Sequence, residues 1–180
     1  MSIDISQLKK FRDNVDKINV DDFCRACSKE LTARLLRKVV KNTPVGDYTR
    51  EIRVTAKRDS KKHKKGDVYT KRVNTSGKLG GTLRRGWTVD THEEAESGVK
   101  VSVTDYVDQI QIKRSGNTYT IEVKNPVEYA SYVEYGHRTR NHQGWVEGQF
   151  ILTGAVDELN GQSQRVIENK LNEWLKDVLK

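Results

Sequence analysis

The sequence has little of what marks an exported, membrane-spanning or disulfide-bonded protein. Its 180 residues include two cysteines, two prolines and only 7% aromatic residues. No apolar run approaches the roughly 20 residues that a membrane helix needs. The amino-terminal stretch MSIDISQLKKF lacks the apolar core of a signal peptide. We therefore expect one domain over residues 1–180, made and folded in the cytoplasm.

The two cysteines do not form a recognisable site. Cys24 and Cys27 stand in the stretch FCRAC, and a C-x-x-C pair can be a redox motif or half of a zinc site. There is no second pair, and no zinc spacing links it to the four histidines, which are His63, His92, His137 and His142. Both cysteines fall on the apolar face of an expected helix, so we interpret them as buried thiols that pack as small hydrophobic groups.

Catalytic motifs are also missing. The sequence contains no G-x-S-x-G, no H-E-x-x-H and no phosphate-binding G-x-x-x-x-G-K-[ST]. No acidic cluster accompanies His137 and His142, and His92 with Glu93 and Glu94 is interpreted as part of a solvated turn. We predict no enzyme activity, no metal and no cofactor.

Positive charge is concentrated in one segment. The chain carries a net +8, yet Arg50 to Arg85 alone holds thirteen lysines and arginines against three acidic residues, a net +10. The remainder is therefore slightly acidic, at −2. Such a segment can contact nucleic acid or an acidic protein surface, or it can be a solvated loop.

The centre of this segment, KRDSKKHKKGD, has no apolar residue. It cannot bury surface to offset its ordering entropy, so we expect a mobile basic loop at about residues 55–75. In the flanking stretches REIRVTA and VYTKRV, polar and apolar residues alternate weakly, which favours two strands of a hairpin. The candidate contacts to DNA or to an acidic partner are Lys57, Arg58, Lys61, Lys62, Lys64, Lys65, Lys71 and Arg72.

Apolar periodicity predicts helices at both ends of the chain. Three- and four-residue spacing indicates a short helix over residues 4–18 and a longer one over residues 20–42, which Pro44 ends. A carboxyl-terminal helix begins at about Phe150 or Gln162 and runs to Lys180.

Between the helices, alternation with a period of two begins at Gly86. Trp87 and Val89, then residues 99–103, 110–112 and 119–123, predict an antiparallel meander, with Ser115-Gly116-Asn117 as a hairpin turn. The predicted fold class is therefore α+β, with an antiparallel sheet packed against amino- and carboxyl-terminal helices.

One segment, VEYASYVEYGHRTR, is unusual for a solvated helix. Tyr129, Tyr132 and Tyr135 recur every three residues in a short helix expected from Val127 to Tyr135 and ended by Gly136. Tyrosines combine apolar area with a hydroxyl group, which is typical of an interface, although such a helix can also lie on the sheet. The candidate interface residues are Tyr129, Tyr132, Glu134, Tyr135, His137, Arg138, Arg140 and Trp145.

The stretch Asn125–Gly136 resembles the hallmark of the phage tail-completion or neck proteins, often labelled tail components. Members carry an A-x-Y-V-E-x-G core, then a polar loop and an aromatic-led segment, here Phe150-Ile151-Leu152. The stretches Thr43-Pro44-Val45 and GTLRRGW at residues 81–87 fit the same family. This chain departs from it at Gln149-Phe150, where many members have P-F, and in its longer basic stretch.

The resemblance implies a structural virion protein with a fold like that of tail terminators. It would form a ring at the head–tail junction that completes the head-proximal end of the tail and joins it to the head connector. Closed rings need heterologous contacts. Six copies are favoured over twelve, and the expected neighbours are connector, tail-tube or terminator proteins, with non-specific contact to genomic DNA in the lumen. The alternatives are a non-specific nucleic-acid-binding module and the collar or terminator ring of a genome-free contractile particle.

Overall fold

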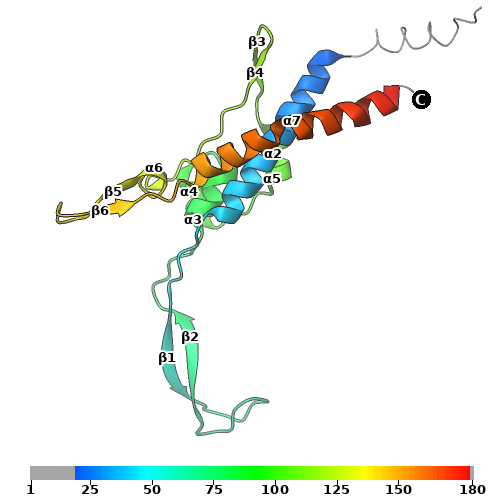
Figure 1. The fold of residues 1–180 in the computed structure, drawn as a ribbon. Coiled ribbons are helices and arrows are strands. Elements are labelled where there is room, and N and C mark those ends of the chain that lie inside the picture. Colours follow the sequence, from blue (N-terminus) through cyan, green and yellow to red (C-terminus); the bar gives the residue numbers. More distant parts are fainter. Residues whose placement is uncertain (1–18, 179–180) are drawn as a thin grey trace, which may run out of the picture.

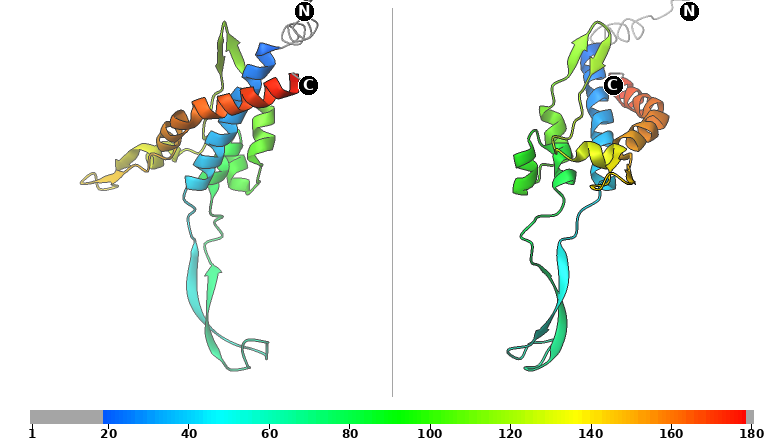
Figure 2. Two further views of the ribbon diagram at one scale, coloured as in Figure 1. Left: turned by 45° about the vertical axis from the view of Figure 1, so that its right-hand side comes forward. Right: turned by 90° about the vertical axis from the view of Figure 1, so that its left-hand side faces the viewer.

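The computed structural model describes residues 19–178, which form a helical body with three projecting two-stranded hairpins (Figures 1 and 2). Two long helices, α2 (Val20–Asn42) and α7 (Ile151–Val178), pack against each other and carry most of the body. The predicted α+β class is confirmed. The helix predicted over residues 4–18 lies outside the described residues. None of the helices described is long and apolar enough to cross a membrane.

Helix α2 has the predicted bounds because its sequence caps it at both ends. The side-chain oxygen of Asn19 accepts hydrogen bonds from the backbone N–H groups of Asp21 and Asp22, at 3.1 and 3.4 Å. Both aspartates also lie in the first turn, where their charge complements the helix dipole. At the other end Pro44 disfavours helical backbone at Thr43, which is extended.

The main core lies where α2 and α7 meet the middle of the chain. Leu36 and Val39 of α2 are fully buried there, and the rings of Phe23 and Trp174 stack at 4.8 Å further along the helix pair. The buried members of this cluster come from four elements and are Ala33, Leu36, Val39, Trp87, Val107, Ile151 and Ala155. Cys27 is also buried in α2 and Cys24 is half-buried, as predicted for packed thiols.

The predicted meander is wrong. The middle of the chain is mostly short helices, with one small hairpin: α3 (Thr82–Arg85), η1 (Gly86–Thr88), α4 (His92–Ser97), α5 (Val103–Gln109), β3 (Lys113–Ser115) and β4 (Thr118–Thr120). Helix capping explains the difference. Thr91 and Glu94 form a reciprocal capping box that starts α4, and Ser102 accepts from the Asp105 N–H to start α5. These caps outweigh a short run of alternating valines. The predicted turn at 115–117 does join β3 and β4.

The basic segment forms the longest hairpin, with β1 (Thr49–Thr55) paired antiparallel to β2 (Val68–Asn74). The predicted hairpin is thus confirmed, and the basic stretch between the strands is confined to residues 56–67. The Ala56 N–H donates to the Asp67 carbonyl at 2.8 Å, which closes this tip. The hairpin points away from the body in every view, and we call it the basic arm (Figures 1 and 2).

The β3–β4 hairpin is held to the start of α2 by one carboxylate. The Tyr119 hydroxyl and an Arg114 guanidinium N–H donate to Asp21 Oδ1, at 2.6 and 2.8 Å, while Arg25 Nε donates to Oδ2 at 2.6 Å. The hydrogen bond from Tyr119, followed by that from Arg25, lowers the pKa of Asp21 from 3.8 to about 2. The anchor therefore depends on an ionised carboxylate.

We expect this anchor to weaken in acid. Because the folded pKa of Asp21 lies below its unfolded value, its contribution is complete above pH 3.8 and is lost as pH falls toward about 2. The protection factors of the β3–β4 amides, which are exchange rates corrected for the intrinsic rate at each pH, should fall over this range. Asp21→Asn should show low protection at every pH. Protection in the native chain that does not change with pH would disprove the ionised anchor.

Candidate functional site

The stretch Thr43-Pro44-Val45 and the stretch GTLRRGW meet in the body. The Trp87 indole Nε1 donates to Thr43 Oγ1 at 2.8 Å, and Arg84 Nε donates to the Thr43 carbonyl at 3.0 Å. Trp87 is 5% exposed and Thr43 is fully buried. The end of α2 is therefore fixed to the α3–η1 segment by buried polar contacts as well as by packing.

The stretch that begins at Asn125 joins the same site from the other side. Asn125 Nδ2 donates to the Leu83 carbonyl at 2.9 Å, and its Oδ1 accepts from the Val127 N–H at 3.1 Å. A Cβ on Gly86 would lie 2.2 Å from Asn125 Oδ1, so only glycine allows this approach. These segments, far apart in sequence, form one packed junction.

Helix α6 (Ala130–Tyr135) connects this junction to α7 through Glu134. The Glu134 side chain is 8% exposed, and its carboxylate accepts from the backbone N–H groups of Leu152 and Thr153, each at 2.9 Å, and from Thr153 Oγ1 at 2.8 Å. It thus satisfies donors of the first turn of α7. Burial raises the pKa of Glu134, but these hydrogen bonds outweigh burial, and the net shift is downward.

Gly136 turns the chain from α6 into a small hairpin of β5 (Gly136–Arg138) and β6 (Trp145–Glu147). Its φ and ψ are 84° and 174°, a region essentially restricted to glycine. A Cβ there would lie 2.4 Å from the Val146 carbonyl oxygen. The hairpin therefore closes tightly over the end of α6 and leads directly into α7.

Large apolar side chains remain exposed on this part of the molecule. Exposed fractions are 58% for Tyr132, 61% for Tyr135 and 57% for Trp145. The rings of Tyr132 and His137 are 5.6 Å apart. We call the whole set the aromatic patch, and its members are Tyr129, Tyr132, Tyr135, Trp145, Val146 and Phe150. Exposed apolar surface of this kind is typical of an interaction site.

Most of the candidate interface residues are solvent-exposed on α6 and the β5–β6 hairpin. His137 and Arg138 lie on β5 and Arg140 on the following loop, and all three are exposed. Glu134 differs, because it is buried and its carboxylate is engaged within the chain. The sequence prediction missed Val146 and Phe150. In the sequence, Phe150 marks only the start of the last segment, and its exposure is visible only in the structure.

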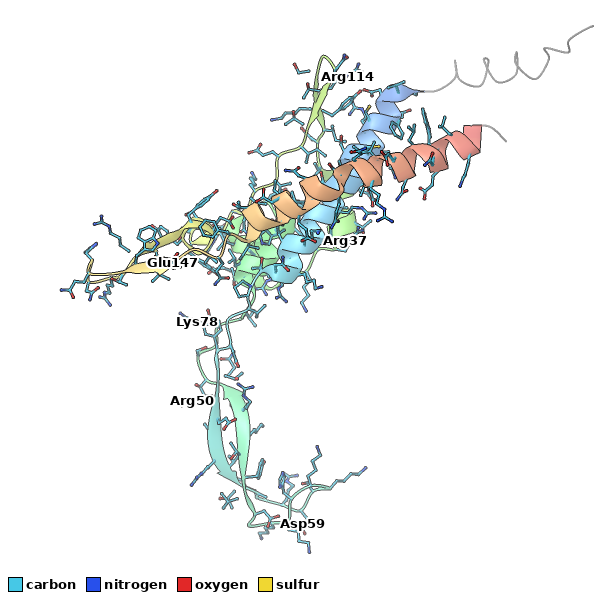
Figure 3. All side chains as sticks on the ribbon, in the orientation of Figure 1. Arg37, Arg50, Asp59, Lys78, Arg114 and Glu147 are labelled. Carbon is cyan, nitrogen blue, oxygen red and sulfur yellow. The ribbon has the colours of Figure 1, made fainter. Side chains whose placement is uncertain are left out.

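The second set of candidate residues lies elsewhere. All eight candidate contacts to DNA or an acidic partner are exposed on the basic arm, far from the β5–β6 hairpin that bears Glu147 (Figure 3). Arg72 is also paired with Asp47, at 2.8 Å. Between Thr49 and Asn74 there are ten lysines and arginines against three acidic residues, a net +7. The structure thus has two separate candidate surfaces.

Neither surface contains a recognisable catalytic arrangement. Within residues 19–178, no group of three or more histidine, cysteine or acidic side chains is placed to hold a metal ion. Burial raises the pKa of the Cys27 thiol, which disfavours the reactive thiolate.

Comparison with known proteins gives one match. A family model described as "Bacteriophage HK97-gp10, putative tail-component" matches residues 7–80 and 70–136. The match ends at Gly136, so it covers the packed junction, the basic arm and α6, but not β6 or α7. No curated protein and no solved structure matches the chain.

Proposed function

Since the chain belongs to the HK97 gp10-like family of phage tail components, we propose that it forms a ring at the head–tail junction of the virion. The ring completes the head-proximal end of the tail and joins it to the head connector. Its role is structural, without catalysis or a cofactor. Six copies are favoured over twelve, with connector and tail-tube or terminator proteins as the neighbours.

The observation that carries this proposal is the aromatic patch. A soluble monomer rarely leaves several aromatic side chains half-exposed on one small protrusion. Three of its members, Tyr129, Tyr132 and Tyr135, belong to the family hallmark at Asn125–Gly136, while Asn125 and Glu134 of the same stretch are used in packing. In a ring, this protrusion would contact a different face of the next copy, which is the heterologous contact that closure requires. Exposed His137, Arg138 and Arg140 would form the polar rim.

Truncating the aromatic patch should prevent joining without unfolding the subunit. We expect the double variant Tyr132→Ala/Trp145→Ala to lose about 2 kcal/mol of interface free energy per aromatic side chain. Electron microscopy of particles made with it should show heads without tails beside unattached tails. The control is Leu171→Ala, since Leu171 is 37% exposed but lies toward the carboxyl-terminal end of α7, outside the patch. Normal particles from the double variant would refute the proposed interface.

A non-specific nucleic-acid-binding module is the second candidate, favoured by the net +7 of the basic arm. It predicts that the purified chain binds DNA with a steep salt dependence. Binding of single strands would also require free aromatic rings. Between Thr49 and Asn74 the only Phe, Trp or Tyr side chain is Tyr69, and its ring is covered by His63, which stacks on it at 4.1 Å.

A third candidate is a contractile particle that carries no genome. There the ring of subunits would cap the tail without contacting DNA.

A further inference from the structure

The two faces of the basic arm differ in chemistry. In an antiparallel pair, residues directly opposite each other share a face, and successive residues alternate between faces. The pairs Arg50/Val73, Ile52/Lys71 and Val54/Tyr69 therefore lie on one face. We call this the apolar face, and its members are Arg50, Ile52, Val54, Tyr69, Lys71 and Val73. The opposite face is polar except for Val68.

Apart from His63, which stacks on Tyr69, the apolar face has no packing partner among the helices and strands of the described part of the chain. The strands β1 and β2 pair with each other and make no appreciable contact with any other helix or strand. An isolated two-stranded hairpin is marginally stable in water and normally needs a packing surface on one face. Seven residues of strand span about 23 Å, so the arm reaches well beyond its own body.

The composition of this face favours a protein partner over DNA. Phosphates attract lysine and arginine without any need for aliphatic side chains. Ile52, Val54 and Val73 would gain nothing from a phosphate backbone, whereas an apolar protein surface would bury them. Arg50 and Lys71, on the same face, require that surface to carry acidic groups as well.

The chain itself carries a surface of this kind around α4 and α5. From Asp90 to Asp108 there are six acidic residues against one lysine, a net −5. Glu93 and Asp105 are exposed and have no ion-pair partner in the described residues. Two exposed apolar side chains lie at the end of α4, Val99 at 52% and Leu79 at 59% exposure, and a Cβ on Gly98 would lie 3.3 Å from Leu79 Cδ1.

A groove borders the same surface. It lies between α5 and β4 and has a volume of about 670 Å³. Its lining combines the apolar side chains of Tyr106, Ile110 and Ile121 with two carboxylates, Asp90 and Glu122, and two lysines, Lys113 and Lys124. Carboxylates and apolar groups thus occur side by side here, as they must to receive the apolar face. The arm points away from its own α4 and α5, so it can meet this surface only on another copy (Figures 1 and 2).

We infer that the apolar face of the basic arm docks on the α4–α5 surface of the next copy in the ring. This inference rests on the proposed ring, and it makes the arm a clamp between subunits. The cationic tip at residues 56–67 extends beyond the contact. Every copy gives one arm and receives one, as a closed cyclic arrangement demands.

Reversing single charges tests the docking face. Lys71→Glu should weaken assembly roughly tenfold, because it places like charges together at the contact. Arg53→Glu is the matched control: it makes the same charge change on the opposite face, and both residues lie opposite an uncharged one. Adding Glu93→Lys should restore assembly of Lys71→Glu. Equal loss from both reversals, combined with no rescue, would indicate a DNA contact and overturn the inference.

Crosslinking in assembled particles separates this inference from the ring itself. In a Cys24→Ala/Cys27→Ala background, Lys71→Cys with Glu93→Cys should give a ladder of covalent multimers. Separately, the photocrosslinking residue p-benzoylphenylalanine in place of Gln143, which is exposed in the loop of the β5–β6 hairpin, should give its own ladder. A ladder from the photocrosslinker alone would keep the ring and refute the arm contact. The absence of any multimer would refute both.

Discussion

Gly136→Ala is expected to lower the free energy of unfolding by about 3 kcal/mol and the melting temperature by roughly 10 °C. Two costs combine. Alanine does not adopt φ 84° with ψ 174° without strain, and its Cβ would meet the Val146 carbonyl oxygen at 2.4 Å. The clash cannot be relieved by a side-chain rotation, because the Val146 oxygen belongs to the backbone of the paired strand β6.

The control for this variant is Gly144→Ala in the loop of the same hairpin. A Cβ at Gly144 meets only Thr139, at 3.4 Å, so the change in stability should stay within about 0.5 kcal/mol. Thermal and urea unfolding of the purified chains would measure both. Equal stability of the two variants would show that the tight turn at Gly136 is not required.

Glu134→Ala should cost about 2–3 kcal/mol, because it removes one charged acceptor of three hydrogen bonds. The backbone N–H groups of Leu152 and Thr153 would be left buried without a partner at the start of α7. The matched control is Glu128→Ala, which removes an exposed glutamate six residues earlier in the same segment. Its effect should be negligible.

The contribution of Glu134 also depends on pH. Its folded pKa lies below the ordinary 4.5, so its stabilisation is complete above pH 4.5 and is lost as pH falls through the lowered value. The difference in stability between the native chain and Glu134→Ala should shrink in that range. A difference that stays constant down to strongly acidic pH would argue against an ionised cap on α7.

The long elements of the fold could be predicted from local sequence. Helix α2 follows from its apolar spacing, from the aspartates in its first turn and from Pro44. The basic hairpin follows from two alternating stretches around an entirely polar one. The middle of the chain could not be predicted this way. There, the alternating valines at 99, 101 and 103 favour a strand, whereas the caps at Thr91 and Ser102 favour helices, and the helices form.

The candidate interface was only partly visible in the sequence. The three-residue spacing of tyrosines in α6 is a local pattern, and their exposure agrees with the predicted placement. The role of Glu134 is not local, since its hydrogen-bond partners lie 18 and 19 residues later. Likewise, the apolar face of the arm exists only in the register that pairs Ile52 with Lys71. The composition of this segment indicates only its basic charge, and the strand pairing is needed to show that Ile52, Val54 and Val73 share one face.

The isolation of the basic arm has a further consequence for the free subunit. Both of its strands have an unpaired outer edge, and such edges invite other chains to pair with them and aggregate. Arg50, Arg53 and Lys71 place like charges along these edges, so two arms repel each other before they can join. The same cations would therefore protect the subunit while it waits for assembly, and neutralising them with alanine should favour precipitation of the unassembled protein.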